Sequence, residues 1–164
     1  MWGMIATWRM AVEGITKGAE LLKDGKDAGD AIETAIREVE DFPYYKSVGY
    51  GGLPNEEMEV EMDAAFMDGD TLDIGAVAAI KDFANPVSIA RRLSHEKVNS
   101  LLVAEGAEKF AHKEGFERKN MLTDRAKAHY RKRIKEMSAQ AAIQAASQKL
   151  KPYSGHDPVG MACL

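Results

Sequence analysis

Residues 11–39 contain two segments with one apolar face each, and this pattern constrains the fold more than any other feature. The apolar residues of the first segment recur at helical spacing on one stripe, namely Ala11, Val12, Ile15, Ala19 and Leu22. The second begins at Asp27, a favourable N-cap, and ends where Phe42 precedes Pro43. A helix with one apolar face must bury that face against another element. The short apolar run from Trp2 to Trp8 has the character of a strand, so the sequence predicts helices layered on a sheet.

After the second helical segment, apolar residues recur at every second position. Acidic and apolar side chains alternate from Glu57 to Met62, and an apolar run continues to Met67. This alternation predicts a half-buried strand whose acids face water. The sequence Asp68-Gly69-Asp70 predicts a hairpin turn, and residues 71–80 then form the return strand. A chain that combines such a hairpin with amphipathic helices belongs to the α+β class.

The remainder of the chain continues this mixture of helices and strands. Asn85 before Pro86 predicts an N-cap and the start of a short helix that runs to Leu93. We also expect a short buried strand over 101–103, a helix over 106–112, a long polar helix over 123–149 and a strand over 159–164.

The charge balance and the cysteine count exclude several classes of protein. The 164 residues carry a formal net charge of -4, so no global attraction to nucleic acid or to an anionic membrane is expected. No apolar run approaches the roughly 20 residues that a membrane-spanning helix needs. Cys163 is the single cysteine of the sequence, which excludes an internal disulfide and fits a reducing compartment. We expect a cytoplasmic protein without a secretion signal.

Four aspartates around the predicted hairpin raise the question of a calcium site. Asp63, Asp68, Asp70 and Asp73 supply oxygen ligands, but their spacing does not match a calcium-binding loop, which needs acids at alternate positions and a later glutamate. A hairpin turn with solvated acids is the favoured interpretation. We expect no metal and no cofactor.

Three other groups of residues have weak signals for chemistry. The basic residues from Arg125 to Lys135 are expected to form a solvated helix face, which is favoured over a nucleic-acid site. The glycines within residues 48–54 lack the lysine of a phosphate loop, so a structural turn or the wall of a small-molecule pocket fits them better. His95, His112 and His129 are scattered, and each is expected at the surface.

Five ordered motifs are more specific than any of these groups, and together they cover nearly the whole chain. They are Val48-Gly49-Tyr50-Gly51-Gly52-Leu53-Pro54, Met62-Asp63-Ala64-Ala65-Phe66-Met67-Asp68-Gly69, Gly75-Ala76-Val77-Ala78-Ala79, Asn85-Pro86-Val87-Ser88-Ile89-Ala90-Arg91 and Gly155-His156-Asp157. In this order they resemble the α portion of the glycosylasparaginases. These enzymes belong to the asparaginase and isoaspartyl-peptidase group of N-terminal nucleophile hydrolases.

The resemblance implies a four-layer αββα sandwich, made as a precursor that cuts itself into α and β portions. It also implies hydrolysis of the amide in N-acetylglucosaminyl-asparagine or of related β-aspartyl amides. In the family a threonine follows a His-Asp pair, frees its own amine by self-cleavage and then attacks the substrate. The corresponding pair is His156-Asp157, and Pro158 stands at the threonine position. Because proline has no hydroxyl, we expect an uncut chain without activity of its own.

The same resemblance sets expectations for the substrate pocket and for partners. Residues 1–164 correspond to the N-terminal half of the sandwich, ending just inside the first strand of the β portion, which supplies most of the family's pocket. Trp8 matches the family tryptophan that borders the pocket, although a core aromatic that anchors the first helix is an equally good interpretation. We expect a β-type subunit or a second copy as partner. The alternative is a non-catalytic relative that pairs with a β-type chain or binds a β-aspartyl ligand.

Overall fold

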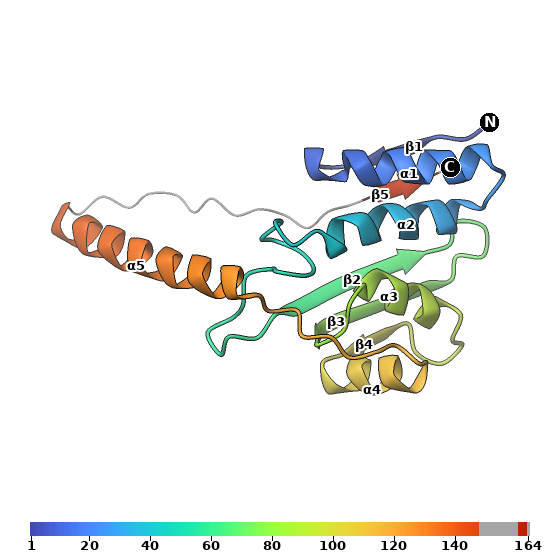
Figure 1. Cartoon of the computed structure of the whole chain (residues 1–164). Coiled ribbons are helices and arrows are strands. Elements are labelled where there is room, and N and C mark those ends of the chain that lie inside the picture. Colours follow the sequence, from blue (N-terminus) through green and yellow to red (C-terminus); the bar gives the residue numbers. More distant parts are fainter. Residues whose placement is uncertain (148–160, 164) are drawn as a thin grey trace.

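A computed structural model of the chain describes residues 1–147 and 161–163, and it has the expected mixture of helices and strands (Figure 1). The first part contains strand β1 (Met4–Ala6), a 3-10 turn (Arg9–Ala11), helix α1 (Val12–Lys23) and helix α2 (Ala28–Asp41). A hairpin of β2 (Glu61–Met67) and β3 (Ile74–Lys81) follows. The remaining elements are α3 (Pro86–Ser94), β4 (Leu101–Val103), α4 (Glu105–Lys113), α5 (Asp124–Ser147) and β5 (Met161–Cys163). None of the described helices is both long and apolar enough to cross a membrane.

Helices α1 and α2 form at the positions predicted from their apolar stripes. The Asp27 carboxylate accepts a hydrogen bond from the Asp30 amide at 2.8 Å, which confirms Asp27 as the N-cap of α2. This bond and the nearby Arg91 lower the pKa of Asp27. Ala31, Ala35 and Val39 are the buried apolar stripe of α2.

The hairpin is antiparallel as predicted, but both of its strands begin later than the sequence indicated. Residues 57–60 do not pair, because the Asn55 side chain accepts hydrogen bonds from the Glu57 and Glu59 amides and holds this segment in a turn. The Asp68 carboxylate likewise accepts from the Asp70 and Thr71 amides, so the return strand starts at Ile74. These amides also lower the pKa of Asp68. The interpretation of the acids as turn residues is therefore confirmed for Asp68.

Helix α3 packs closely on one face of the hairpin (Figure 1). Gly75 permits the approach, since a Cβ atom there would lie 2.1 Å from the Ala90 carbonyl oxygen. The core between the helix and the sheet contains the buried side chains Val77, Ile80, Phe83, Ile89 and Leu93. A polar contact adds to this packing on the other side of α3, where Arg91 forms ion pairs with Asp30 at 2.8 Å and with Glu33 at 2.7 Å on α2.

The opposite face of the same sheet is apolar and open among the described residues. Strand β4 runs parallel to β3, and its register pairs Ala76 with Leu101 and Ala78 with Val103. The strand forms at the predicted residues and Leu102 packs against the core, but the expectation of burial was wrong for Leu101 and Val103, which are 56% and 52% exposed. Met67 and Ile74 are paired opposite each other at the hairpin end of the sheet and are also exposed. Among residues 1–147 and 161–163, the sheet thus buries the face that α3 covers and leaves the apolar residues of the other face exposed.

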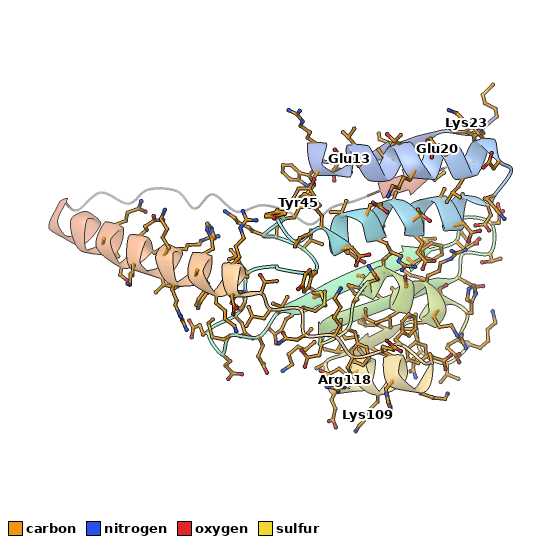
Figure 2. The ribbon with its side chains drawn as sticks, in the orientation of Figure 1. Glu13, Glu20, Lys23, Tyr45, Lys109 and Arg118 are labelled. Carbon is orange, nitrogen blue, oxygen red and sulfur yellow. The ribbon has the colours of Figure 1, made fainter. Side chains whose placement is uncertain are left out.

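The two remaining elements differ in how they contact this layered body: β5 lies against α2, whereas α5 extends away from it (Figure 1). Strand β5 pairs antiparallel with β1, with Met4 opposite Cys163, which confirms a strand at the end of the chain. Helix α5 projects away from the rest of the molecule, and side chains stand out on several sides of it (Figures 1 and 2). Its residues 131–141 are all exposed, in agreement with a solvated helix.

Candidate active-site pocket

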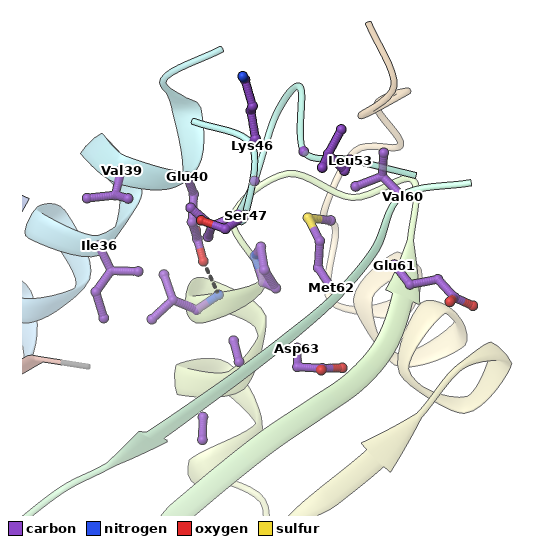
Figure 3. A pocket seen from close by; sticks show the side chains of 17 residues that line it. Ile36, Val39, Glu40, Lys46, Ser47, Leu53, Val60, Glu61, Met62 and Asp63 are labelled. Carbon is purple, nitrogen blue, oxygen red and sulfur yellow. Dashed lines mark hydrogen bonds between the residues drawn. The ribbon is translucent and has the colours of Figure 1, made fainter. Parts of the chain in front are cut away.

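The glycine-containing loop between α2 and β2, residues 42–60, is the pocket loop. It forms one wall of a pocket of about 210 Å³. The end of α2, the start of β2 and the N-terminus of α3 form the other walls (Figure 3). Most of the lining is apolar, and its charged side chains are Glu40, Lys46, Glu61 and Asp63. The loop thus lines a pocket, and its role in binding a small molecule stays a prediction.

Gly49 sets the shape of the loop against the end of α2. Its φ angle is +68°, and a Cβ atom there would lie 2.0 Å from the Glu40 carbonyl oxygen. The next amide, that of Tyr50, donates a hydrogen bond of 2.7 Å to the same oxygen. Only glycine combines this backbone conformation with such a close approach, so the loop has little freedom to move away from Glu40.

Glu40 is the most unusual ionisable residue in the pocket wall, because its side chain is only 2% exposed. One carboxylate oxygen accepts from the Asn85 amide group at 3.3 Å, and the other accepts from the Val87 backbone amide at 3.3 Å. Burial raises the pKa of Glu40 to about 8, although these two hydrogen bonds act in the opposite direction. The carboxyl group is therefore largely protonated at neutral pH.

Asn85 takes a different role from the one predicted for it. It occupies the N-cap position of α3 with a left-handed φ of 52°, but its side chain makes no capping hydrogen bond. Its amide group instead donates to Glu40 and, at 3.2 Å, to Asp41. The Val87 backbone amide lies in the first turn of α3, where an amide has no partner within the helix. It donates instead to the Glu40 carboxylate, so the end of α2 caps α3 across the pocket.

Asp63 stabilises an irregularity of the sheet beside the pocket. The register between β2 and β3 shifts between Met62 and Ala64, which is the mark of a β-bulge. Ala79 has a positive φ of 50° there, and its amide donates a hydrogen bond of 2.7 Å to the Asp63 carboxylate. No group of acids, histidines or cysteines among the described residues could hold a metal ion.

Trp8 lies two residues after the end of β1, at the N-cap of the 3-10 turn that leads into α1. Its side chain is 47% exposed, and its φ of 62° is rare for a residue other than glycine. Met10 follows two residues later, and its carbonyl accepts a hydrogen bond of 3.4 Å from the Tyr45 hydroxyl. Tyr45 belongs to the pocket loop (Figure 2), so this bond connects the loop to the segment that carries Trp8.

The other predicted residues are not part of this pocket. His156, Asp157 and Pro158 lie outside the described residues. His95 and His112 are exposed, whereas His129 is half-buried on α5. The expectation of a surface position is therefore confirmed for the first two histidines only.

Glu40 has no distinguishing signal in the sequence. The second helical segment contains several acids, and neither spacing nor composition distinguishes Glu40 from Glu33 or Glu38. The burial of Glu40 depends on its contacts with Gly49 in the loop and with Val87 in α3. Both residues are distant from Glu40 along the chain.

Comparison with known proteins identifies the family of this chain. The sequence model of the family described as Asparaginase matches residues 5–163, which is nearly the whole chain. The chain belongs to the asparaginase family.

Several curated relatives of this asparaginase-family chain have related names. It is 32% identical over 161 residues to an N(4)-(Beta-N-acetylglucosaminyl)-L-asparaginase of Elizabethkingia miricola, covering 98% of this chain and 45% of the relative. It is 37% identical over 143 residues to an isoaspartyl peptidase/L-asparaginase of Xenopus laevis, covering 85% of this chain and 46% of the relative. A plant-type L-asparaginase of Thermococcus kodakarensis is 43% identical over 112 residues, covering 68% of this chain and 36% of the relative. The chain thus spans less than half the length of each of these relatives.

Proposed function

We propose that this chain is the α portion of an asparaginase-type amidohydrolase for β-aspartyl amides such as N-acetylglucosaminyl-asparagine. The observation that carries the proposal is the family match over residues 5–163, together with the names of the relatives. The activity then belongs to a larger assembly, to which this chain contributes the pocket loop and Trp8. No cofactor is part of the proposal, and a cytoplasmic location fits the single cysteine.

Pro158 leads us to propose that the chain itself is neither cut nor active. The family's chemistry needs a hydroxyl to attack the preceding carbonyl and then the substrate, and proline has none. Proline also biases Asp157 towards extended conformations. His156 and Asp157 then remain inside an intact polypeptide.

We also propose that the chain forms half of a four-layer αββα sandwich. The open sheet face supports this, because Met67, Ile74, Leu101 and Val103 place a continuous apolar surface opposite the helices. A β-type portion or a second copy that supplies a second sheet would bury this face. Trp8 would border the substrate pocket, which its 47% exposure and its connection to the loop support.

Intact-mass measurement and a hydrolysis assay test these proposals together. We expect the purified chain to keep a single mass on prolonged incubation and to release no aspartate from N-acetylglucosaminyl-asparagine. The Pro158→Thr variant should also lack hydrolytic activity, because most of the pocket lies in the β portion. Spontaneous cleavage after Asp157, or hydrolysis by the isolated variant, would contradict the proposal.

A non-catalytic partner chain is the second candidate function, and Pro158 is the observation that favours it. Such a chain would pair with a β-type chain or bind a β-aspartyl ligand without turnover. Light scattering addresses the pairing, because the exposed apolar face should cause self-association when no partner is present. A monodisperse, cooperatively melting monomer of 18.0 kDa would argue against such pairing.

A further inference from the structure

The loop between α3 and β4, residues 95–100, presents an Asn-Ser sequence at the surface (Figure 1). Asn99 and Ser100 are both exposed, and the preceding Val98 is 90% exposed. An asparagine before a small residue can lose ammonia, because the next backbone nitrogen can attack the side-chain carbonyl carbon and close a five-membered ring. The reaction needs a side chain and a following amide that are free to rotate towards each other, as exposed loops allow.

The contacts of this loop leave both reacting groups available. Within residues 1–147 and 161–163, the Asn99 side chain makes no hydrogen bond, and the Ser100 backbone amide donates none. The chain is fixed immediately afterwards, since the Ser100 carbonyl accepts a hydrogen bond of 2.7 Å from the Ala76 amide on β3. The reacting groups therefore lie in the last unpaired step before the sheet.

The other three asparagines of the sequence are held or blocked. The Asn55 side chain accepts hydrogen bonds of 3.0 Å from two backbone amides, and the Asn120 side chain accepts one of 2.9 Å from a third. Asn85 precedes Pro86, whose nitrogen carries no hydrogen and cannot close the ring. Among the described residues, which include every asparagine, Asn99 is thus the one that combines a free side chain with a free following amide.

We propose that Asn99 is a site of spontaneous deamidation that converts the Asn99–Ser100 peptide bond into an isoaspartyl linkage. The Ser100 nitrogen forms a bond to the Asn99 Cγ atom and gives up its proton, and the side-chain nitrogen leaves as ammonia. Water then opens the cyclic imide. Attack at the side-chain carbonyl yields an ordinary aspartate, whereas attack at the main-chain carbonyl yields isoaspartate. The reaction needs only water, so it is independent of the proposed hydrolase activity.

The isoaspartyl form should loosen strand β4. Its main chain passes through the side-chain carbon of residue 99, so it is one methylene longer just before the Ser100 carbonyl. This carbonyl then no longer lies in its original place opposite the Ala76 amide, whose bond begins the pairing of β3 with β4. Strand β4 has three residues and lies at the edge of the described sheet, so few other bonds hold it.

Peptide mapping by mass spectrometry, after the intact folded chain has been incubated at pH 7 and at pH 9, tests the site. The peptide with Asn99 should gain one mass unit and separate into aspartyl and isoaspartyl forms, faster at pH 9 because hydroxide removes the Ser100 amide proton. Asn120 is the internal control and should react about fivefold more slowly or less, because one hydrogen bond must first break. Asn99→Gln must close a less favourable six-membered ring, so its peptide should keep its mass. Equal rates at Asn99 and Asn120 would overturn the proposal.

Hydrogen exchange then tests the effect on β4. The isoaspartyl form, separated by chromatography, should exchange the Ala76 amide about fivefold faster than the unmodified chain, as expected for the loss of its hydrogen bond. Asn99→Asp is the matched control, because it carries the same new charge on an ordinary backbone and should exchange at the original rate. If isoaspartate forms and the Ala76 amide exchanges no faster, the deamidation site stands and the loosening of β4 is wrong.

Discussion

The protonation of Glu40 predicts a specific dependence of stability on pH. In the folded chain the pKa of Glu40 is raised to about 8, whereas the ordinary value for a glutamate is 4.5. Between these two values, the unfolded chain has lost a proton that the folded chain retains. The free energy of unfolding therefore falls as pH rises, by up to about 1.4 kcal/mol per pH unit from this one group.

The Glu40→Gln variant removes this contribution while it keeps the size of the side chain. From pH 5 to pH 7 the wild-type protein should lose about 3 kcal/mol more of its unfolding free energy than the variant does. For a chain of this length such a difference corresponds to roughly 6–12 °C in Tm. The glutamine retains one oxygen that can accept from Asn85 or Val87, so some destabilisation that does not vary with pH is also expected.

Urea unfolding followed by circular dichroism at pH 5, 6, 7 and 8 measures this difference. Glu38→Gln is the matched control, because it removes a carboxylate from the same helix at a site where the side chain is 36% exposed and paired with Lys17. Its stability relative to wild type should vary little with pH. A constant difference between Glu40→Gln and wild type at all four pH values would refute the protonated state of Glu40.

Two further substitutions test the contacts that shape the fold. Gly49→Ala should destabilise the chain by about 2 kcal/mol or more, because Gly49 has a positive φ and contacts the Glu40 carbonyl. Gly3→Ala is the control, since no atom lies within 4 Å of the added Cβ, and it should have little effect in the same urea assay. Arg91→Ala should cost about 1–2 kcal/mol, and less in high salt, because it leaves two carboxylates of α2 without their partner. Arg92→Ala is its control, since that more exposed arginine should contribute less than half as much, and equal losses would argue against the α2–α3 contact.

Local patterns predicted most of the helices and the hairpin, because their signals lie within a few residues of one another. Asp27 caps α2 through a bond to Asp30, and the apolar stripe that follows is the one that becomes buried. The predicted strand boundaries were less accurate than the helix positions. The alternation of side chains predicts that the amides after Asn55 and Asp68 pair with a neighbouring strand, but these amides donate to the Asn55 and Asp68 side chains instead.

The candidate site depends on contacts that no local pattern contains. Asn85 has the sequence of an N-cap, but its amide group is occupied by Glu40, a residue far away along the chain. The exposure of β4 was also not predictable, because an apolar run of three residues does not reveal whether anything covers it. The motifs of the family were visible in the sequence, although the arrangement of the pocket around Glu40 was not.

The pairing of β1 with β5 has a consequence for the order of folding. Met4 lies opposite Cys163, so this contact closes a loop that includes almost the entire chain. The entropy lost on closing so long a loop must be offset by interactions that already exist, and the described residues form three pairs here. We therefore expect the helices and the hairpin to assemble first and the two ends of the chain to meet last. The same contact should be the first to open, which makes the protection of the Ile5 amide from hydrogen exchange a sensitive measure of partial unfolding.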